Sequence, residues 1–252
     1  MSAVAFLQAL DLPETCRVDQ RVPKKLVVEH GAPTSADKRA IAEGVDELLW
    51  LAALKPGTVG VPAYRDDARE YVEIVVLRLA LRAEAKASRL VELVHRAIPY
   101  PTLLLAEESG RLEISAAHKR WSQAEAGQTV LDGDVVAVEW KADEDGERWP
   151  AFTPTMALGQ QPRLSLFALY QGWIDAMLAL TAARTTGAFA VAESPERATA
   201  RRQALEECAR LDAEAARLRS RAAKEKQMAR RVELNLELKR LGAALAAARA
   251  NL

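Results

Sequence analysis

The alternation of hydrophobic and polar positions along the chain predicts a domain of strands and helices. Residues 71–81 read Tyr-Val-Glu-Ile-Val-Val-Leu-Arg-Leu-Ala-Leu, a run of β-branched and aliphatic residues that is typical of a central strand. Helical periodicity predicts a helix over residues 84–98, and a strand at residues 102–106 follows it. The dipeptide Ser109-Gly110 then predicts a turn into another strand at residues 111–116, so these two strands are expected to form a hairpin.

The remaining segments before residue 142 are assigned in the same way. Residues 1–33 are expected to form an arm on the body of the domain. Thr34 is expected to cap a helix that continues to residue 55 with one apolar face, and Asp37 to reach back to the Thr34 amide. Short strands are expected at residues 25–29, 58–62, 129–131 and 135–141, with the last two paired across Asp132-Gly133-Asp134.

This order of elements predicts an α+β fold, in which helices cover one face of a mixed, largely antiparallel sheet. Parallel pairing across the helix at residues 84–98 is an equal alternative. The chain then divides into an α+β domain (1–141), a linker or loop (142–163), an apolar packing helix capped by Ser165 (164–187) and a basic coiled-coil tail (195–252).

The tail contains two stripes of small and apolar residues. No glycine and no further proline follow Pro195 before residue 242, which favours one long helix beginning after Ser194. The stripes have coiled-coil spacing but are out of phase across residues 223–233, so the helix either carries a stutter or folds back as a hairpin. Such a seam needs a partner helix, and the candidate partner-binding residues are Leu211, Leu218, Leu234, Leu238, Leu241 and Leu245.

Charge is distributed unevenly, although basic and acidic residues each number 35. From Pro195 to the end the chain has 14 basic and 8 acidic residues, against 21 and 27 before it. The cations concentrate in Arg217–Arg231, where they would favour a phosphate backbone, although a solvated coil face is the simpler interpretation. The candidate nucleic-acid-binding residues there are Arg217, Arg219, Arg221, Lys224, Lys226, Arg230 and Arg231.

A second basic group, His118, Lys119 and Arg120, follows the strand at residues 111–116. Three such side chains at a strand end could hold an anion or nucleic acid, although an isolated histidine is more often an ordinary surface residue. His95, inside the predicted helix, is expected to be solvated or to cap that helix.

Enzyme activity has only a weak candidate in the sequence. Asp66, Asp67, Glu70 and Glu73, together with Lys119, raise a degenerate metal-dependent nuclease as the alternative function, because clustered carboxylates can hold Mg²⁺. Arginines lie among these acids, so a salt-bridged surface explains them equally well. Without a phosphate-binding loop, nucleophile elbow or HExxH motif, we assign no catalytic residue, no metal ligand and no cofactor.

The cellular location is expected to be the cytoplasm. Cys16 and Cys208 lie far apart without metal-ligand spacing, which suits a reducing compartment. The start of the chain lacks the basic region of a secretory signal. Gln171 and Asp175 interrupt the most apolar helix, so no membrane span is expected.

Several segments resemble a bacterial family known as domain of unknown function 4391. They are Val22-Pro23-Lys24-Lys25-Leu26, Ser35-Ala36-Asp37-Lys38, Leu48 to Leu54, Ile98-Pro99-Tyr100-Pro101, Ala116 to Arg120, Lys224-Glu225-Lys226-Gln227 and Val232-Glu233-Leu234-Asn235. The resemblance covers most of the chain and implies no established chemistry. It implies a genomic setting beside helicase-like and DNA-methyltransferase genes, as in restriction-like phage-defence islands.

Together these observations predict a non-enzymatic accessory subunit. Its coil would bind a helicase-like or methyltransferase partner, or a second copy of the chain, and its cations would contact DNA or RNA.

Overall fold

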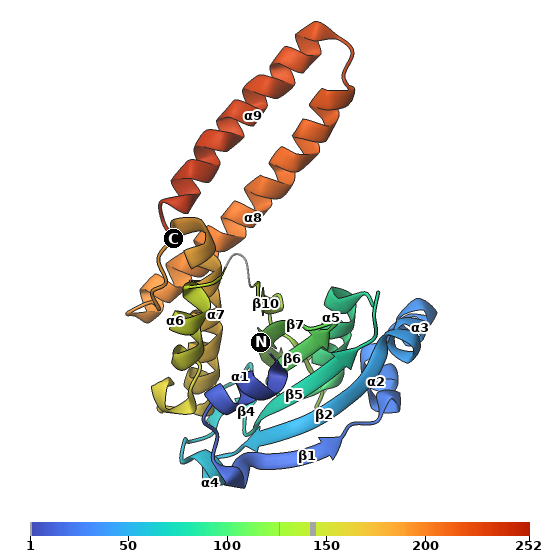
Figure 1. Cartoon of the computed structure of the whole chain (residues 1–252), viewed down its shortest axis with the longest axis vertical. Coiled ribbons are helices and arrows are strands. Elements are labelled where there is room, and N and C mark those ends of the chain that lie inside the picture. The colour runs from blue at the N-terminus through green and yellow to red at the C-terminus, as the bar shows by residue number, and fades with distance from the viewer. Residues whose placement is uncertain (1, 126, 142–144) are drawn as a thin grey trace. The chain divides into compact units, whose positions relative to one another are not determined.

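The computed structural model describes residues 2–125, 127–141 and 145–252 (Figure 1). The chain divides into two compact units, Met1–Met177 and Leu178–Leu252, which we call the sheet domain and the helical unit. Helix α7 (Leu166–Thr186) begins in the first unit and ends in the second.

The centre of the sheet domain is a six-stranded mixed sheet with strand order β1-β2-β5-β6-β7-β10. Its strands are β1 (Arg17–Arg21), β2 (Val45–Leu54), β5 (Ile74–Leu81), β6 (Thr102–Glu108), β7 (Arg111–Ala117) and β10 (Val136–Glu139). Neighbouring strands are antiparallel except β5 and β6, which are parallel and joined through α5 (Ala87–Ala97). The predicted α+β fold with a mixed sheet is therefore confirmed, as is the β6–β7 hairpin.

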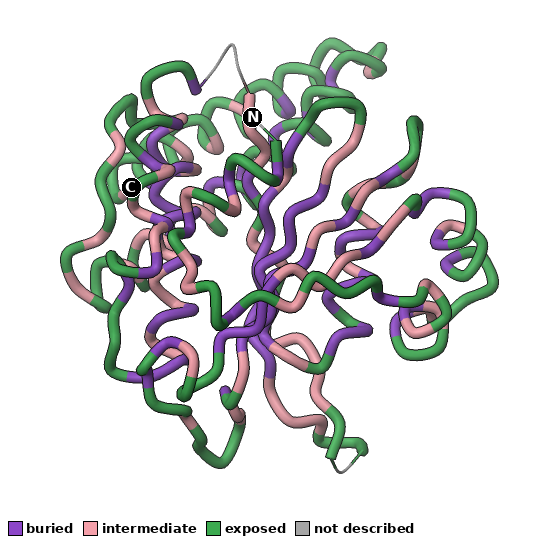
Figure 2. The backbone as a smooth tube through the Cα atoms, turned by 60° about the horizontal axis from the view of Figure 1, so that its bottom comes forward, coloured by how far each residue is buried: buried purple, intermediate pink, exposed green. Residues whose placement is uncertain are grey.

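Helices cover both faces of this sheet, so the prediction of a single covered face is wrong. On one face α2 (Lys24–Gly31), α3 (Ser35–Gly44) and α5 pack over a core that includes Leu77 and Leu104. On the other face the amide of Ala3 in α1 (Ala3–Ala9) donates a 2.7 Å hydrogen bond to Glu107 of β6. Because β5 and β6 are apolar at most positions of both registers, both of their faces exclude water. The tube in Figure 2 is accordingly buried through the middle of the sheet.

The segment after Thr34 changes from helix to strand. Thr34 Oγ1 accepts the Asp37 amide at 3.1 Å, so the helix begins as predicted, but α3 ends at Gly44 and residues 45–54 form β2. The apolar residues of this stretch fit either structure. The strand prevails because β2 pairs along its length with β5 and, over residues 49–52, with β1 on its other side, and the periodicity of one segment does not reveal such partners.

Several shorter predictions are also corrected. Residues 25–29 lie in the helix α2 and residues 58–62 overlap the helical turn α4 (Pro56–Val59), rather than forming strands. The expected arm contains η1 (Glu14–Cys16) and the edge strand β1. Strand β9 (Thr129–Leu131) pairs with β8 (Lys119–Trp121) and β10 pairs with β7, so the expected pairing of residues 129–131 with 135–141 is wrong. The remaining two-residue strands, β3 (Tyr64–Arg65) and β4 (Glu70–Tyr71), pair with each other.

Residues 145–163 are more ordered than the loop or linker that their composition indicates. They include the helix α6 (Arg148–Thr155) and the turn η2 (Leu158–Gln160). Trp149 and Phe152 of α6 are buried and contact Phe6 of α1, so apolar packing holds this segment to the domain. Residues 142–144, also part of the expected linker, lie outside the described residues.

Helix α7 is the helix predicted to start after Ser165, whose Oγ accepts the Ala168 amide at 3.2 Å. It has the length and composition to cross a membrane, but 67% of its apolar window is buried within the protein. Tyr170 and Trp173 are fully buried, and the Trp173 indole donates to the Met156 carbonyl at 2.8 Å. This burial is typical of a core helix.

The helical unit contains the hairpin of α8 (Pro195–Lys224) and α9 (Met228–Arg249), which run antiparallel (Figure 1). Ser194 caps α8 as predicted, since its Oγ accepts the Arg197 amide at 3.3 Å. The single straight helix that the composition favours is interrupted at residues 225–227, so the hairpin alternative is the observed one. The two apolar stripes face each other; Leu211 packs near Ala248, and Leu218 near Leu234.

Candidate nucleic-acid interface

The seven cations of Arg217–Arg231 gather at one end of the helical hairpin. They lie in the last turns of α8, in the connecting loop and in the first turn of α9, and all seven are exposed. We call this end of the hairpin the tip. Folding the chain at residues 225–227 brings cations from two helices together, which a straight helix would spread over several turns.

The tip cations are free of carboxylates, in contrast to the rest of the hairpin. Arg210 pairs with Glu207 at 2.7 Å and with Glu214 at 3.1 Å, and Arg249 pairs with Asp212 at 3.4 Å. Within the described hairpin no cation of the tip has a carboxylate oxygen within ion-pair distance. The one acid of the tip, Glu225, accepts the Gln227 amide at 2.9 Å and so shapes the loop instead.

Two of these cations occupy an electrostatically unfavourable place. Arg230 and Arg231 lie in the first turn of α9, which contains no acidic residue. The N-terminus of a helix is the positive end of its dipole, so cations at this end are destabilising and anions are stabilising. The tip therefore combines unpaired cations with a helix end that favours negative charge, and a phosphate group would relieve both.

The six leucines predicted to bind a partner lie in the seam of the hairpin. Leu211, Leu218 and Leu234 are buried, and Leu238, Leu241 and Leu245 are half-buried against them. Each stripe has thus found its partner helix within the same chain. The leucines stabilise the hairpin, and a further partner would have to use another face of it.

The second basic group does not form a cationic surface. His118 and Lys119 are 9% and 2% exposed, whereas Arg120 is half-buried and lies 3.8 Å from Asp132. The Lys119 ammonium donates to the backbone carbonyl of His95, at the C-terminal turn of α5. A cation is favourable at that end of a helix, so Lys119 fastens β8 to α5 rather than offering charge to a ligand.

Burial changes the titration of both residues in this contact. The pKa of Lys119 is lowered to about 7, because desolvation disfavours its charged form. His95, expected to be solvated or to cap α5, is instead fully buried with Nε2 3.0 Å from Ser115 Oγ. Its desolvation, with a smaller contribution from Lys119, lowers the pKa of His95 to about 3, so this ring is neutral.

His118 belongs to a chain of hydrogen bonds that joins the sheet to α7. Its Nδ1 accepts from the Tyr71 hydroxyl at 2.6 Å, and its Nε2 donates to Gln171 Oε1 at 2.8 Å. This direction follows because the Gln171 amide nitrogen donates in turn to Asp175 at 2.9 Å. Burial raises the pKa of the Tyr71 hydroxyl, so Tyr71 is not an activated nucleophile. Sequence reasoning missed Tyr71 and Gln171, which carry no motif.

Tyr170 also joins α7 to the sheet, through hydrogen bonds to backbone atoms of β6 and β7. Its hydroxyl accepts the Ala117 amide at 2.9 Å and donates to the Thr102 carbonyl at 2.7 Å, in a fully buried position. Substitution Tyr170→Phe removes the partner of a buried amide, so we expect the free energy of unfolding to fall by about 1–3 kcal/mol. Urea titration followed by tryptophan fluorescence measures this in the sheet domain, which holds all five tryptophans. Tyr100→Phe is the matched control, and an equal loss from both variants would contradict the assignment.

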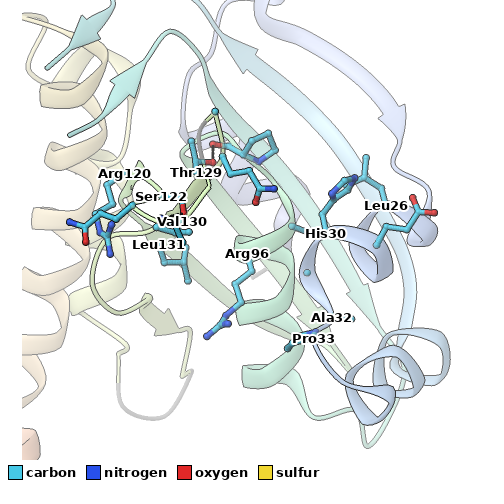
Figure 3. A pocket seen from close by; sticks show the side chains of 18 residues that line it. Leu26, His30, Ala32, Pro33, Arg96, Arg120, Ser122, Thr129, Val130 and Leu131 are labelled. Atoms are coloured by element: carbon cyan, nitrogen blue, oxygen red, sulfur yellow. Dashed lines mark hydrogen bonds between the residues drawn. The ribbon is translucent and has the colours of Figure 1, made fainter. Parts of the chain in front are cut away.

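A groove of about 970 Å³ in the sheet domain is the main alternative to the tip (Figure 3). Arg96 and Arg120 line it, together with residues of the β9 strand and the C-terminal ends of α2 and α5. Both arginines already have acidic neighbours, Glu92 at 2.7 Å and Asp132 at 3.8 Å. Helix C-terminal ends also repel anions, so this groove suits phosphate less well than the tip.

Three of the four acidic residues of the nuclease alternative, Asp66, Glu70 and Glu73, are engaged by neighbours. Asp66 accepts the Ala68 and Arg69 amides at 2.8 and 2.7 Å, Glu70 pairs with Arg65, and Glu73 lies 3.4 Å from Lys55. Among the described residues, no three acids, histidines or cysteines are grouped to hold a metal ion. The salt-bridged surface is therefore the arrangement observed for Asp66, Glu70 and Glu73.

Comparison with known families places the chain. Residues 10–245 match the family model described as a domain of unknown function, DUF4391. The chain belongs to the DUF4391 family. Searches of curated proteins and of solved structures each find no match. In this DUF4391 protein the match extends from the sheet domain to α9 and therefore includes the hairpin tip, and the resemblance noted from the sequence is confirmed.

Proposed function

We propose that this DUF4391 protein is a non-enzymatic accessory subunit that binds nucleic acid through the tip of its helical hairpin. The observation that carries the proposal is the set of seven exposed cations without acidic partners at the α8–α9 turn. Cations that do not stabilise the fold by pairing remain available to neutralise phosphates, and release of counterions then drives binding.

The chemistry of the tip favours recognition of the phosphate backbone. No aromatic side chain occurs between Pro195 and Leu252, so the tip has no surface on which an unpaired base could stack. Arginine and lysine contacts to phosphate carry no sequence information by themselves. The proposed activity is therefore independent of sequence, and a duplex presents the denser array of phosphates.

The proposed setting is a cytoplasmic phage-defence system of the restriction type, in which the subunit acts beside a helicase-like or methyltransferase protein. Membership of DUF4391 supports this setting through the gene context that the family resemblance implies. Cys16 and Cys208 are both free and buried, which suits a reducing compartment. The nuclease alternative has no comparable observation in its favour.

The proposal is tested by measuring the affinity of the full chain for two short DNA duplexes of unrelated sequence over a series of salt concentrations. We expect equal affinities for the two duplexes and a log–log slope of about −4 to −6, which corresponds to between four and seven contacted phosphates. A single strand and an RNA duplex of the same length distinguish the kinds of nucleic acid. Undetectable binding at low salt, or an affinity that salt does not change, would refute the proposal.

A further inference from the structure

Helix α9 is apolar on two opposite faces. One face carries Leu234, Leu241 and Leu245 and packs against α8. The other begins with Met228, Val232 and Leu236 at intervals of four residues and continues through alanines at 243, 246, 247 and 250. We call this second set the outer stripe. A helix with apolar residues on two faces is typical of one that lies between two neighbours.

The outer stripe is uncovered within the helical unit. Met228, Val232 and Leu236 are 65%, 52% and 55% exposed. They are three of the seven large hydrophobic residues that are exposed in the described part of the chain, and the other four are scattered singly. Contiguous exposed apolar residues on a helix mark an interaction surface more often than isolated ones do.

Charge along the outer stripe selects its occupant. Lys239 lies within the stripe, and Arg231 and Arg240 border it on its two sides, against one bordering acid, Glu233. The helical unit as a whole has 15 basic and 9 acidic residues. A second copy of the chain would therefore bring like charges together, with Lys239 inside the contact, and this opposes self-association.

We propose that the outer stripe docks an amphipathic helix of another protein whose apolar face is bordered by Asp and Glu. The proposal deepens the accessory role and rests on it, because it names the surface for a protein partner. An acidic residue opposite Lys239 would pair with it inside the apolar contact. The arrangement resembles the docking of helices in grooves, with anchors at successive turns of both helices.

This surface is separate from the tip cations of α8, although Arg231 of the tip borders it. Arg217, Arg221 and Lys224 lie on the other helix of the hairpin, and the outer stripe is opposite the seam that faces α8. Nucleic acid on the tip and a helix on the outer stripe are thus compatible. We expect a variant to lose nucleic-acid binding at the tip while keeping helix docking on the outer stripe, or the reverse.

Photo-crosslinking in the native cells tests the docking proposal. A photoreactive residue replaces Val232 or Leu236 in the full chain, and Ala223, exposed on α8, serves as the control position. We expect both outer-stripe positions, and not position 223, to crosslink to one segment of another protein. That segment, identified by mass spectrometry, is expected to be an amphipathic helix with acidic borders. Crosslinks to a second copy, to nucleic acid, to a segment without acids, or to nothing would each overturn the proposal.

A charge exchange then separates docking from general attraction. Lys239→Glu should weaken binding of the identified partner by about tenfold, and reversing the facing acid of the partner to Lys should restore it. Failure of the reversal to restore binding would refute the assigned contact. Measuring the affinity of the Leu236→Glu variant for a DNA duplex distinguishes a failure of the docking proposal from a failure of the nucleic-acid proposal. Retained duplex binding with lost crosslinking assigns the stripe to the partner alone, whereas crosslinking without any duplex binding refutes the nucleic-acid proposal alone.

Discussion

Replacing Arg217, Arg221, Lys224 and Arg230 by Gln should lower the affinity for a DNA duplex by roughly 4 × 10³-fold at about 0.1 M salt, because each phosphate contact contributes about eightfold there. The same substitutions should make the log–log salt slope less negative by about 3.6, which is 0.9 for each lost contact. Fluorescence anisotropy with a labelled duplex measures both quantities. The four residues are exposed and unpaired, so the helicity of the variant should be unchanged.

A matched variant separates the position of the charges from their number. Arg197, Arg202, Arg210 and Arg249 lie away from the tip, and replacing them by Gln changes the net charge by the same amount. This control should keep most of the affinity and nearly the full salt slope. If the control loses as much affinity as the tip variant, binding depends on net charge and the tip is not the interface.

The second large effect is a dependence of stability on pH that originates at Lys119. Burial lowers the pKa of this ammonium to about 7 in the folded chain, whereas an unfolded lysine has its ordinary value of about 10.4. Between these two values the unfolded chain binds the extra proton. The free energy of unfolding contributed by Lys119 therefore rises with pH through this window, by about 1.4 kcal/mol per pH unit, and is constant below it.

Lys119→Met tests this origin because it removes the titrating group while keeping much of its volume. Urea titrations followed by tryptophan fluorescence at pH 7.5, 8.5 and 9.5 compare wild type with the variant, and the difference in slope is assigned to Lys119. Lys38→Met replaces an exposed lysine and should keep the wild-type slope. Parallel pH profiles for wild type and Lys119→Met would show that Lys119 is solvated and not fastened to α5.

Local sequence patterns correctly predicted the elements whose secondary structure follows from the residues of the element itself. The run at residues 71–81 forms the central strand β5 over residues 74–81, and the helix α5 lies within the expected residues 84–98. The turn at Ser109-Gly110 produced the β6–β7 hairpin, since Gly110 has a φ of 83° that suits glycine. For β5, the local propensity of the segment agrees with its pairing to β2 and β6, which are distant in the chain.

Sequence patterns gave wrong predictions where contacts with residues far apart in the chain determine the secondary structure. Residues 45–54 have apolar spacing for either a helix or a strand, and pairing with both β1 and β5 decided for the strand. The reverse happened at residues 25–29, which are β-branched enough for a strand but pack as a helix against α5 in the core. In both segments the free energy gained by burial exceeds the difference in intrinsic secondary-structure propensity.

The candidate site shows the same division. The cations of Arg217–Arg231 are evident in the printed sequence, but their lack of acidic partners and their gathering at a turn required the hairpin. His118 and Lys119 have the composition of a surface cluster, yet they are buried and bonded to Tyr71 and His95. The spacing of Met228, Val232 and Leu236 was a signal for the outer stripe, since it repeats every four residues beside the recognised seam.

The sequence by itself determined the α+β class, the basic character of the C-terminal region and the presence of two apolar stripes, because composition and periodicity are local properties. Only the tertiary structure decided that the stripes pair with each other, that the chain turns at residues 225–227, and that α9 keeps a second apolar face exposed. The physical reason is that the apolar spacing of a helix face predicts that the face is buried, but not which element buries it. That choice depends on contacts between residues far apart in the chain.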